Sequence, residues 1–332
     1  MTYQHISVVG AGSWGTALAL VAARAGRDVT LWARNAEHAA HMRSQRENAR
    51  YLPDTRLPEA ISPTADLEQL TGSQAVLLAV PAQTLRSVAA SLADVLPQNC
   101  PVVLCAKGIE HRTGFLMSEV LGEVLPGHRI AVLSGPTFAA EVARGLPTAV
   151  TLACEQMSVA MELTRSLAAP FFRPYASGDV IGVEIAGAMK NVIAIACGIV
   201  LGRGLGENAK ASLITRSLAE MQRLVVAKGG MAPTLMGLAG VGDLTLTCST
   251  EQSRNFAFGA LIGRGMPVEE AKSRPDIVVE GVHTAQAVPD LVQSLGIEMP
   301  ICEAVARVLH EDGDIDQAMA ELLSRPLRPE GT

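Results

Sequence analysis

Aromatic and charged residues are scarce in this chain of 332 residues. Only 3% of the residues are aromatic and 18% are charged, and the net charge is −6. So few aromatic side chains leave few surfaces on which nucleic-acid bases can stack, and an acidic chain does not suit a polyphosphate backbone, so we expect no nucleic-acid partner. Hydrophobic residues still make up 48% of the chain. That fraction can bury a core and excludes intrinsic disorder.

Closely spaced cysteines and metal-ligand patterns are also lacking. No two of the six cysteines form a CxxC pair, and His111 and His283 stand apart from other ligand types. We therefore expect buried, reduced thiols, with neither disulfides nor a bound metal.

The start of the chain has no basic segment followed by a long apolar run, so no secretory signal is expected. The longest apolar stretch, residues 185–201, is shorter than the ~20 residues of a membrane-spanning helix and contains Lys190 and Asn191. We interpret it as a core helix, and expect a cytoplasmic protein without membrane insertion.

What the sequence does contain is an alternation of short apolar runs and helical patterns up to about residue 178. Strands are predicted at 6–9, 28–32, 75–80, 102–106, 130–133 and 149–153, and helices between them at 14–25, 36–47, 83–95, 114–124, 137–144 and 157–168. Continuously apolar strands joined by helices indicate a parallel sheet covered on both faces. The prediction is an α/β, Rossmann-type doubly wound domain over residues 1–178.

Beyond residue 178 the strand signal ends. Helical periodicity continues at 180–202, 207–229, 254–264, 267–272, 284–294, 300–311 and 316–323. Residues 179–332 are therefore predicted to form a second, all-helical domain.

The first predicted strand runs into Gly10-Ala-Gly12-Ser-Trp-Gly15 and then a helix. In a dinucleotide-binding turn, the first glycine allows the tight turn, the second lets a pyrophosphate approach the backbone, and the third lets the helix pack on the sheet. Unpaired N–H groups at the helix start would face the anion. A purely structural turn is the alternative.

The second predicted strand does not end in the acidic residue that usually binds a free ribose 2′-hydroxyl. Arg34 occupies that place, whereas Asp28 lies at the other end of the strand. A guanidinium suits a 2′-phosphate, so we expect NADP to be preferred and NAD to remain possible. A solvated surface arginine is the alternative.

Lys190 stands among apolar neighbours in the predicted core helix. Burial disfavours the charged form of an amine, and a lysine tuned toward neutrality can exchange a proton with an alcohol or a carbonyl oxygen. The alternative is a side chain that extends past its neighbours to water. Asn191, next to it, could also hydrogen-bond a ligand.

Two further turns follow predicted strands. Lys107 comes directly after the strand at 102–106, and Gly135-Pro-Thr137 follows the strand at 130–133. Ligands of doubly wound sheets bind at such carboxyl ends, although an ordinary strand-to-helix connection would look the same.

In the helical half, three glycines lead to Asp243, and Ser253-Arg254-Asn255 follows. Arg254 could clamp a phosphate, while Asp243 and Thr247 could hold hydroxyls or orient an amine. Taken singly, Asp243 could equally be a helix cap and Arg254 a surface charge.

Together these blocks resemble the bacterial NAD(P)-dependent glycerol-3-phosphate dehydrogenases. The resemblance rests on the motifs at 10–17, 106–108, 135–141, 184–191, 240–243, 253–255 and 279–281, which occur in that family's order. It implies interconversion of dihydroxyacetone phosphate and sn-glycerol 3-phosphate by hydride transfer, a role in phospholipid supply, and a homodimer.

The resemblance also implies roles for individual residues. Lys190 would be the catalytic proton donor and acceptor. The substrate would be bound by Lys107, Gly135, Thr137, Lys190, Asp243, Ser253, Arg254 and Asn255. The cofactor would be bound by Gly10, Gly12, Ser13, Trp14, Gly15, Arg34, Lys107, Ala139, Arg254, Val278 and Glu280.

Two other functions stay open from the residues alone. A related dehydrogenase for a hydroxy acid or sugar acid would share the glycine turn but need an arginine directed at a carboxylate. A non-enzymatic dinucleotide sensor would keep residues 10–15 and Arg34 but have no use for a buried lysine.

Overall fold

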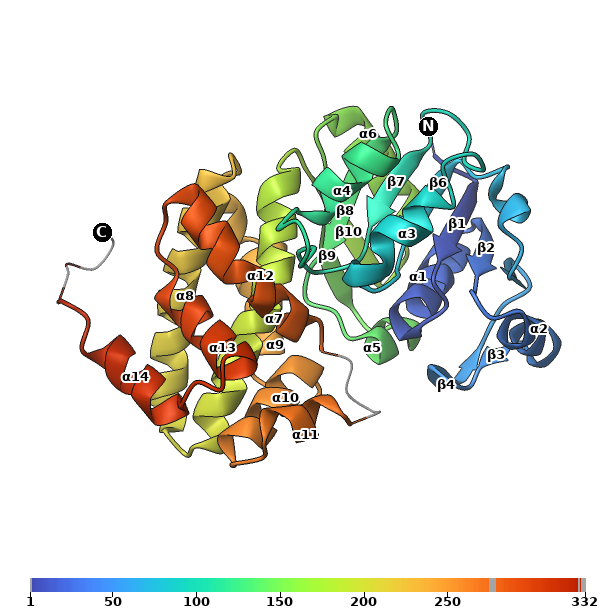
Figure 1. Ribbon diagram of the computed structural model, residues 1–332. Coiled ribbons are helices and arrows are strands. Elements are labelled where there is room, and N and C mark those ends of the chain that lie inside the picture. Colours follow the sequence, from blue (N-terminus) through green and yellow to red (C-terminus); the bar gives the residue numbers. More distant parts are fainter. Residues whose placement is uncertain (1, 275–278, 328, 330–332) are drawn as a thin grey trace. The chain divides into compact units, whose positions relative to one another are not determined.

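The computed structural model describes residues 2–274, 279–327 and 329 (Figure 1). Internal contacts divide the chain into two compact units. Met1–Lys107 and Met117–Val183 form the α/β unit, and Gly108–Leu116 and Glu184–Thr332 form the helical unit. The division lies five residues beyond the position expected from sequence, and the short segment 108–116 groups with the helices.

An eight-stranded sheet forms the centre of the α/β unit. Its strands are β1 (His5–Val9), β2 (Asp28–Trp32), β5 (Ile61–Thr64), β6 (Ala75–Leu78), β7 (Pro101–Leu104), β8 (Arg129–Ser134), β9 (Thr148–Cys154) and β10 (Phe172–Ser177). The spatial order is β10-β9-β8-β7-β6-β1-β2-β5. The chain therefore proceeds outward from β1 to one side and then returns to its other side, which places the topological switch point between β1 and β6.

The predicted parallel arrangement is confirmed for β1, β2, β6, β7 and β8. The unpredicted strand β5 is also parallel to β2, but the prediction is wrong for β9, which runs antiparallel to β8. The connection between them contains only the five-residue helix α5 (Ala139–Ala143). At 1.5 Å per residue this helix is too short to carry the chain back along a six-residue strand, so β9 starts at the edge where β8 ends.

Both edge strands escaped the sequence prediction for the same reason. β5 contains Pro63 and β10 contains Pro174. Proline removes one ladder hydrogen bond and is tolerated at a sheet edge, yet it interrupts the apolar runs by which strands are recognised.

Helices cover the sheet in the doubly wound manner that the sequence predicted (Figure 1). The helices of this unit are α1 (Ser13–Arg24), α2 (Ala36–Gln45), α3 (Leu85–Ala90), α4 (Met117–Val124), α5 and α6 (Met157–Leu167). Apolar residues of α1, α5 and α6 share one core with alternate residues of the strands, including Ile6, Val8 and Leu77. The two-stranded hairpin of β3 (Glu47–Asn48) and β4 (Leu52–Arg56) stands outside the sheet.

The helical unit is built around α7 (Val180–Gly202), with α8 (Gly206–Ala227), α9 (Asp243–Thr247), α10 (Arg254–Gly263), α11 (Val268–Lys272), α12 (Glu280–Leu295), α13 (Pro300–His310) and α14 (Ile315–Leu323). α7 is long and apolar enough to cross a membrane, but 89% of its most apolar window is buried inside the protein. It is therefore the core helix that the sequence predicted.

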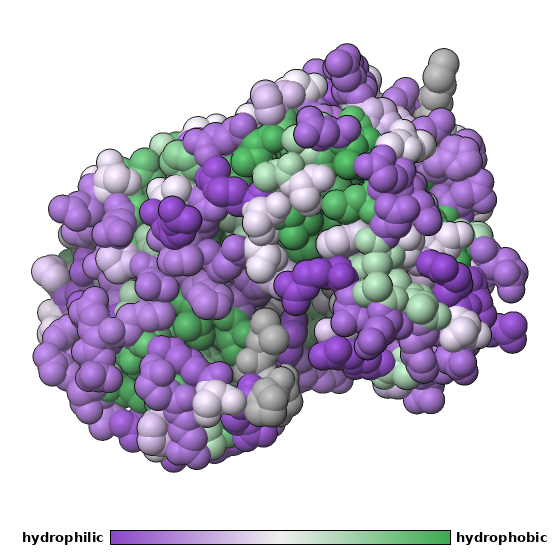
Figure 2. All heavy atoms as spheres, turned by 45° about the vertical axis from the view of Figure 1, so that its right-hand side comes forward, coloured by the Kyte–Doolittle hydropathy of each residue, from purple (hydrophilic) through white to green (hydrophobic). Residues whose placement is uncertain are grey.

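Hydrophilic residues cover most of the face drawn in Figure 2, with smaller hydrophobic areas between them.

Glycines bring α7 and α10 into backbone contact. A Cβ atom on Gly198 would lie 2.1 Å from the Phe256 carbonyl oxygen, and one on Gly259 would lie 2.1 Å from the Ile195 carbonyl oxygen. Neither position can accept a side chain without moving a helix, so this close crossing explains part of the chain's richness in glycine.

Candidate cofactor and catalytic site

The three glycines of the turn between β1 and α1 differ in what the fold requires of them. Gly10 has a φ of +109°, and a Cβ there would lie 2.7 Å from the Ala79 carbonyl oxygen; a Cβ on Gly15 would lie 1.8 Å from the Gly10 carbonyl oxygen. A Cβ on Gly12 would meet nothing within 4 Å, and its φ of −77° suits any residue. The fold explains Gly10 and Gly15, whereas Gly12 leaves open space beside the backbone, as a pyrophosphate site requires.

The start of α1 offers donors toward that space. No side chain caps the helix, so its first backbone N–H groups keep the exposed, partly positive end that attracts anions. Among the residues that the structure describes, the buried indole Nε1 of Trp14 has no hydrogen-bond acceptor. A buried indole N–H usually has a partner, so this donor also suits a bound ligand. The Ser13 hydroxyl donates to the Tyr51 carbonyl at 2.6 Å.

Arg34 lies just beyond β2, at the carboxyl end of the strand next to β1. Its side chain is exposed, and the next residue, Asn35, caps α2 by accepting a hydrogen bond from the His38 amide at 2.7 Å. Asp28 is at the opposite end of β2. The exposed guanidinium can therefore bind a phosphate at this edge, and the Asp28 carboxylate is too far away to repel that phosphate.

Lys107 and the turn after β8 come together in the α/β unit. Lys107 Nζ donates to the Gly135 carbonyl at 3.2 Å, and the Thr137 hydroxyl donates to the same oxygen at 3.2 Å. Gly135 has a φ of +148°, and a Cβ there would lie 2.9 Å from Val150 Cα, so only glycine fits. Ala139 begins α5 directly after this turn. The arrangement places an ammonium group and a hydroxyl beside one carbonyl at the carboxyl ends of the strands.

In the helical unit, Lys190 of α7 is buried and paired. Its Nζ lies 2.5 Å from Asp243 Oδ1 and donates to the Thr247 hydroxyl at 2.9 Å, while that hydroxyl lies 3.3 Å from the same carboxylate oxygen. The Lys190 side chain is 8% exposed and the Asp243 side chain is fully buried. The side chain of Lys190 therefore does not extend to water, and Asp243 acts as a counter-ion rather than as a helix cap.

A thiol lies next to this pair without sharing its chemistry. Cys248 directly follows Thr247, and a hydrogen bond with Cys197, together with burial, holds the pKa of the Cys248 thiol well above its usual range. The thiol therefore stays protonated at neutral pH and is no nucleophile. All six cysteines are buried, as predicted.

A chain of amide hydrogen bonds surrounds the start of α12. Asn255 Nδ2 donates to Asn191 Oδ1 at 3.0 Å, and Asn255 Oδ1 accepts from the Gly281 amide at 3.0 Å. Asn191 and Asn255 are both buried. Two of the predicted polar residues are thus used to fix α7, α10 and α12 to one another.

The remaining predicted residues are distributed around these contacts. Ser253 caps α10 by accepting from the Phe256 amide at 3.3 Å, Arg254 is exposed in the first turn of that helix, and Glu280 begins α12. Val278 lies outside the described residues. The α/β unit therefore carries the glycine turn and, separately, the contacts of Lys107 with the Gly135–Thr137 turn. The helical unit carries Lys190 with Asp243 and Thr247, and the hydrogen bonds of Asn255.

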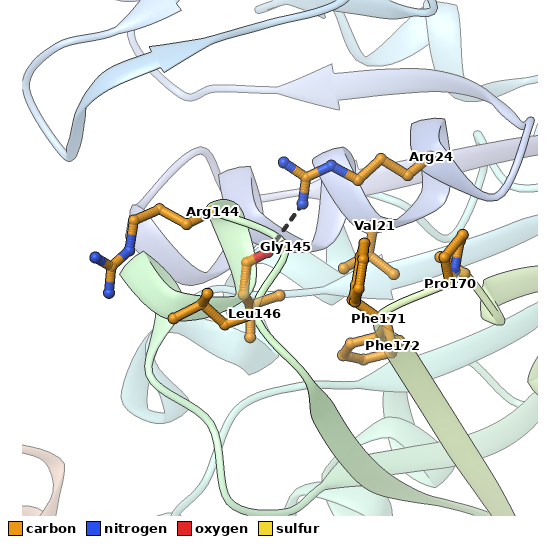
Figure 3. Close-up of a pocket in the computed structure, with 10 residues that line it drawn as sticks. Val21, Arg24, Arg144, Gly145, Leu146, Pro170, Phe171 and Phe172 are labelled. Carbon is orange, nitrogen blue, oxygen red and sulfur yellow. Dashed lines mark hydrogen bonds between the residues drawn. The ribbon is translucent and has the colours of Figure 1, made fainter.

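A pocket of about 350 Å³ lies elsewhere in the α/β unit and contains none of the predicted site residues (Figure 3). Val21, Leu146, Phe171 and Phe172 give it an apolar lining, and Arg24 at its border donates to the Val142 carbonyl at 2.9 Å. The pocket contains no group suited to proton transfer, so it is not the catalytic site.

The α/β unit has a glycine turn at the switch point of a doubly wound sheet, and the helices that follow in the chain bury a lysine–aspartate pair. These two features are typical of Rossmann-type dehydrogenases. Comparison with known proteins narrows this class. Models of the N-terminal and C-terminal regions of NAD-dependent glycerol-3-phosphate dehydrogenase match residues 5–160 and 179–320. The chain belongs to this family.

Individual relatives agree along the whole chain. Glycerol-3-phosphate dehydrogenases [NAD(P)+] from Parvibaculum lavamentivorans and Methylobacterium radiotolerans are 52% and 54% identical, with 99% of both chains covered in the first case and 98% of both in the second. The crystal structure of glycerol-3-phosphate dehydrogenase from Coxiella burnetii matches with a TM-score of 0.92 at 43% identity, covering 97% of this chain and 99% of that one. The family expected from the sequence motifs and the predicted two-part fold class are both confirmed.

Proposed function

We propose that this protein is an oxidoreductase that interconverts dihydroxyacetone phosphate and sn-glycerol 3-phosphate, with NAD(P)H as the hydride donor in reduction. Membership of the family supports the reaction, and the observation that carries it is the buried Lys190, held by Asp243 and Thr247. A non-enzymatic dinucleotide sensor would not require a buried lysine. The family match indicates a dehydrogenase of glycerol 3-phosphate and not of a hydroxy acid.

Lys190 supplies and removes the proton in this proposal. As an ammonium it polarises the ketone oxygen of dihydroxyacetone phosphate and donates a proton to that oxygen during reduction. In the reverse direction the neutral amine takes the proton of the C2 hydroxyl. Asp243 and Thr247 hold the amine in one position. Less conformational entropy is then lost when the amine and the substrate oxygen reach the reactive geometry.

The nicotinamide cofactor, when bound, supplies the hydride, and the chain's task is to hold that cofactor. Gly12 and the start of α1 would take its pyrophosphate, with Trp14 Nε1 and the Ser13 backbone N–H as further donors. Gly10 and Gly15 shape the turn, while Lys107, Ala139, Arg254, Val278 and Glu280 are proposed contacts from the family resemblance. Arg34 would bind a 2′-phosphate, so NADPH is the proposed preference over NADH.

The substrate's phosphate is proposed to bind Arg254 together with Asn255 and Ser253. Lys107, Gly135 and Thr137 would hold the rest of the triose phosphate. Binding energy from a phosphate far from the reacting carbon can be used to align the carbonyl, so loss of a phosphate contact should reduce turnover as well as affinity.

Three further proposals rest on the family resemblance alone. The protein would act in the cytoplasm, form a homodimer through its helical domain, and supply sn-glycerol 3-phosphate for phospholipid synthesis. Sedimentation at micromolar concentration tests the dimer directly.

The reaction is tested by following NADPH and NADH absorbance with purified protein and dihydroxyacetone phosphate. We expect oxidation of both cofactors, with a higher kcat/KM for NADPH. Small 2-keto acids and dihydroxyacetone without phosphate serve as comparison substrates. Turnover of a keto acid in preference to dihydroxyacetone phosphate would reject the proposal, as would absence of oxidation with the phosphorylated ketone.

A further inference from the structure

The β3–β4 hairpin, residues 47–56, lies against α2 and contributes nothing to the main sheet (Figure 1). The side chain of Arg46 fastens its base through hydrogen bonds to the carbonyls of Leu57, Pro58 and Ile61. The hairpin is thus fixed in place although it adds no strand to the main sheet. Its contacts with the glycine turn suggest what this fixed position is for.

Asn48 is the point at which the hairpin meets the turn. Its side chain is fully buried, and Nδ2 donates to the Ala11 carbonyl at 2.9 Å and to the Thr16 hydroxyl at 2.7 Å. Ala11 lies between Gly10 and Gly12, and Thr16 follows Gly15. One amide group therefore holds both ends of the glycine turn.

The other end of the same amide is also occupied. Because the Ala11 carbonyl can only accept, the amide nitrogen must face it, and Oδ1 must face His38 Nε2 at 2.9 Å. His38 Nε2 is therefore the donor of this hydrogen bond. The ring of His38 lies 5.5 Å from that of Tyr51, whose carbonyl accepts from the Ser13 hydroxyl.

His38 in turn belongs to the segment that follows β2. Its backbone amide donates to Asn35 Oδ1, and Asn35 is the neighbour of Arg34. A continuous series of hydrogen bonds thus runs from the residues proposed for the ribose end of the cofactor, through His38 and Asn48, to the turn proposed for its pyrophosphate.

We propose that Asn48 and His38 are positioning residues for the dinucleotide: they touch no substrate but fix the distance between the Arg34 segment and the glycine turn. The inference rests on the proposed cofactor site. A phosphate-binding turn works only when its N–H groups already point at the ligand, so a turn released from Asn48 would have to be ordered again at each binding event. Cofactor affinity should then fall, while the proton transfer at Lys190 is untouched.

The decisive variants are Asn48→Asp, which keeps the acceptor for His38 but replaces both donors to the turn, and His38→Gln beside His38→Leu. Affinity for NADPH and NADH is measured by quenching of tryptophan fluorescence, alongside KM and kcat with dihydroxyacetone phosphate. We expect Asn48→Asp to raise the Kd of both cofactors at least ten-fold with kcat at saturation within two-fold. Because glutamine retains an N–H donor, His38→Gln should bind more tightly than His38→Leu.

Ser73→Ala is the matched control, because it removes two buried hydrogen bonds at the opposite end of the strands, one from Ser73 Oγ to the Leu70 carbonyl and one between the Ser73 and Ser7 hydroxyls, both at 2.6 Å. A purely structural role for Asn48 would lower the melting temperature in both variants and leave both Kd values unchanged, which would overturn the proposal. Equal binding by His38→Gln and His38→Leu would remove His38 from it. If the parent protein itself bound neither cofactor, the proposed function would fail instead.

Discussion

Lys190 and Asp243, which are 53 positions apart in the chain, form a buried ion pair with 2.5 Å between Nζ and Oδ1. Two charges removed from water are stable there only because each neutralises the other and because Thr247 provides a further hydrogen bond. The pair has two consequences that can be tested separately. In the proposed reaction it would hold an amine ready for proton transfer, and it makes each charge dependent on its partner for the stability of the helical unit.

Lys190→Ala should lower kcat by several orders of magnitude, because the proposed proton donor is lost. NADPH binding should persist, because the α/β unit is unchanged. Since this change also leaves Asp243 unpaired, the double variant Lys190→Met/Asp243→Asn, which removes both charges, is the folded comparison. Initial rates and fluorescence titration measure the two effects. Lys210→Ala, which affects only an ion pair with the exposed Glu207, is the control. Near-normal turnover without Lys190 would disprove its role.

Asp243→Asn should destabilise the protein by about 3–5 kcal/mol, because an ammonium group is then buried without a counter-charge. Thr247→Val removes a neutral hydrogen bond and should cost only about 1 kcal/mol. Chemical denaturation gives both values. Equal stability losses in the two variants would contradict this account of the pair.

Arg34→Ala should lower kcat/KM for NADPH about 10- to 100-fold, the loss expected from a charge-assisted hydrogen bond of about 1.5–3 kcal/mol, and leave that for NADH nearly unchanged. Steady-state rates with each cofactor measure this ratio. Arg165→Ala, at an exposed position in the last turn of α6, is the control. It changes the net charge by the same amount but should leave kcat/KM for both cofactors unchanged. A parallel loss with NADPH and NADH would mean that Arg34 does not read the 2′-phosphate.

What could be predicted from the sequence was local. Gly10, Gly12 and Gly15 lie within six residues, and strand, turn and helix follow one another in the order in which they are read. Lys190 was recognisable as a charge in an apolar helix, but its pairing with Asp243 depends on how α9 packs against α7, which no periodicity encodes. No helix was predicted between residues 229 and 254, whereas residues 238–247 form a π-helical turn and the short helix α9.

Asn48 and His38 gave no signal at all. An asparagine between helical and turn residues looks like a solvated loop residue, and only the structure shows it to be fully buried beside Ala11 and Thr16. The antiparallel direction of β9 was missed for a similar reason, because it depends on the length of α5, and predicted helix boundaries are uncertain by several residues.

The close crossing of α7 and α10 predicts opposite effects for two glycine substitutions. Gly198→Ala should cost about 1–3 kcal/mol, because its Cβ would meet a backbone oxygen that cannot move alone. Gly122→Ala, at an exposed position of α4 where a Cβ meets nothing within 4 Å, should stabilise the protein by up to about 1 kcal/mol. Urea denaturation measures both, and a tolerated Gly198→Ala would mean that the helices are not in backbone contact.

The surroundings of His283 predict a loss of stability in acid. Burial, followed by the nearby His111, His310 and Lys272, lowers the pKa of His283 below its usual 6.5, so the folded protein favours the neutral ring. Stability from this preference is present above pH 6.5 and is lost as the pH falls through the lowered pKa, because the unfolded chain then binds a proton more readily. His283→Asn should therefore reduce the fall in melting temperature between pH 7.5 and 5.5. An unchanged slope in His283→Asn would show that this histidine does not contribute to the acid sensitivity.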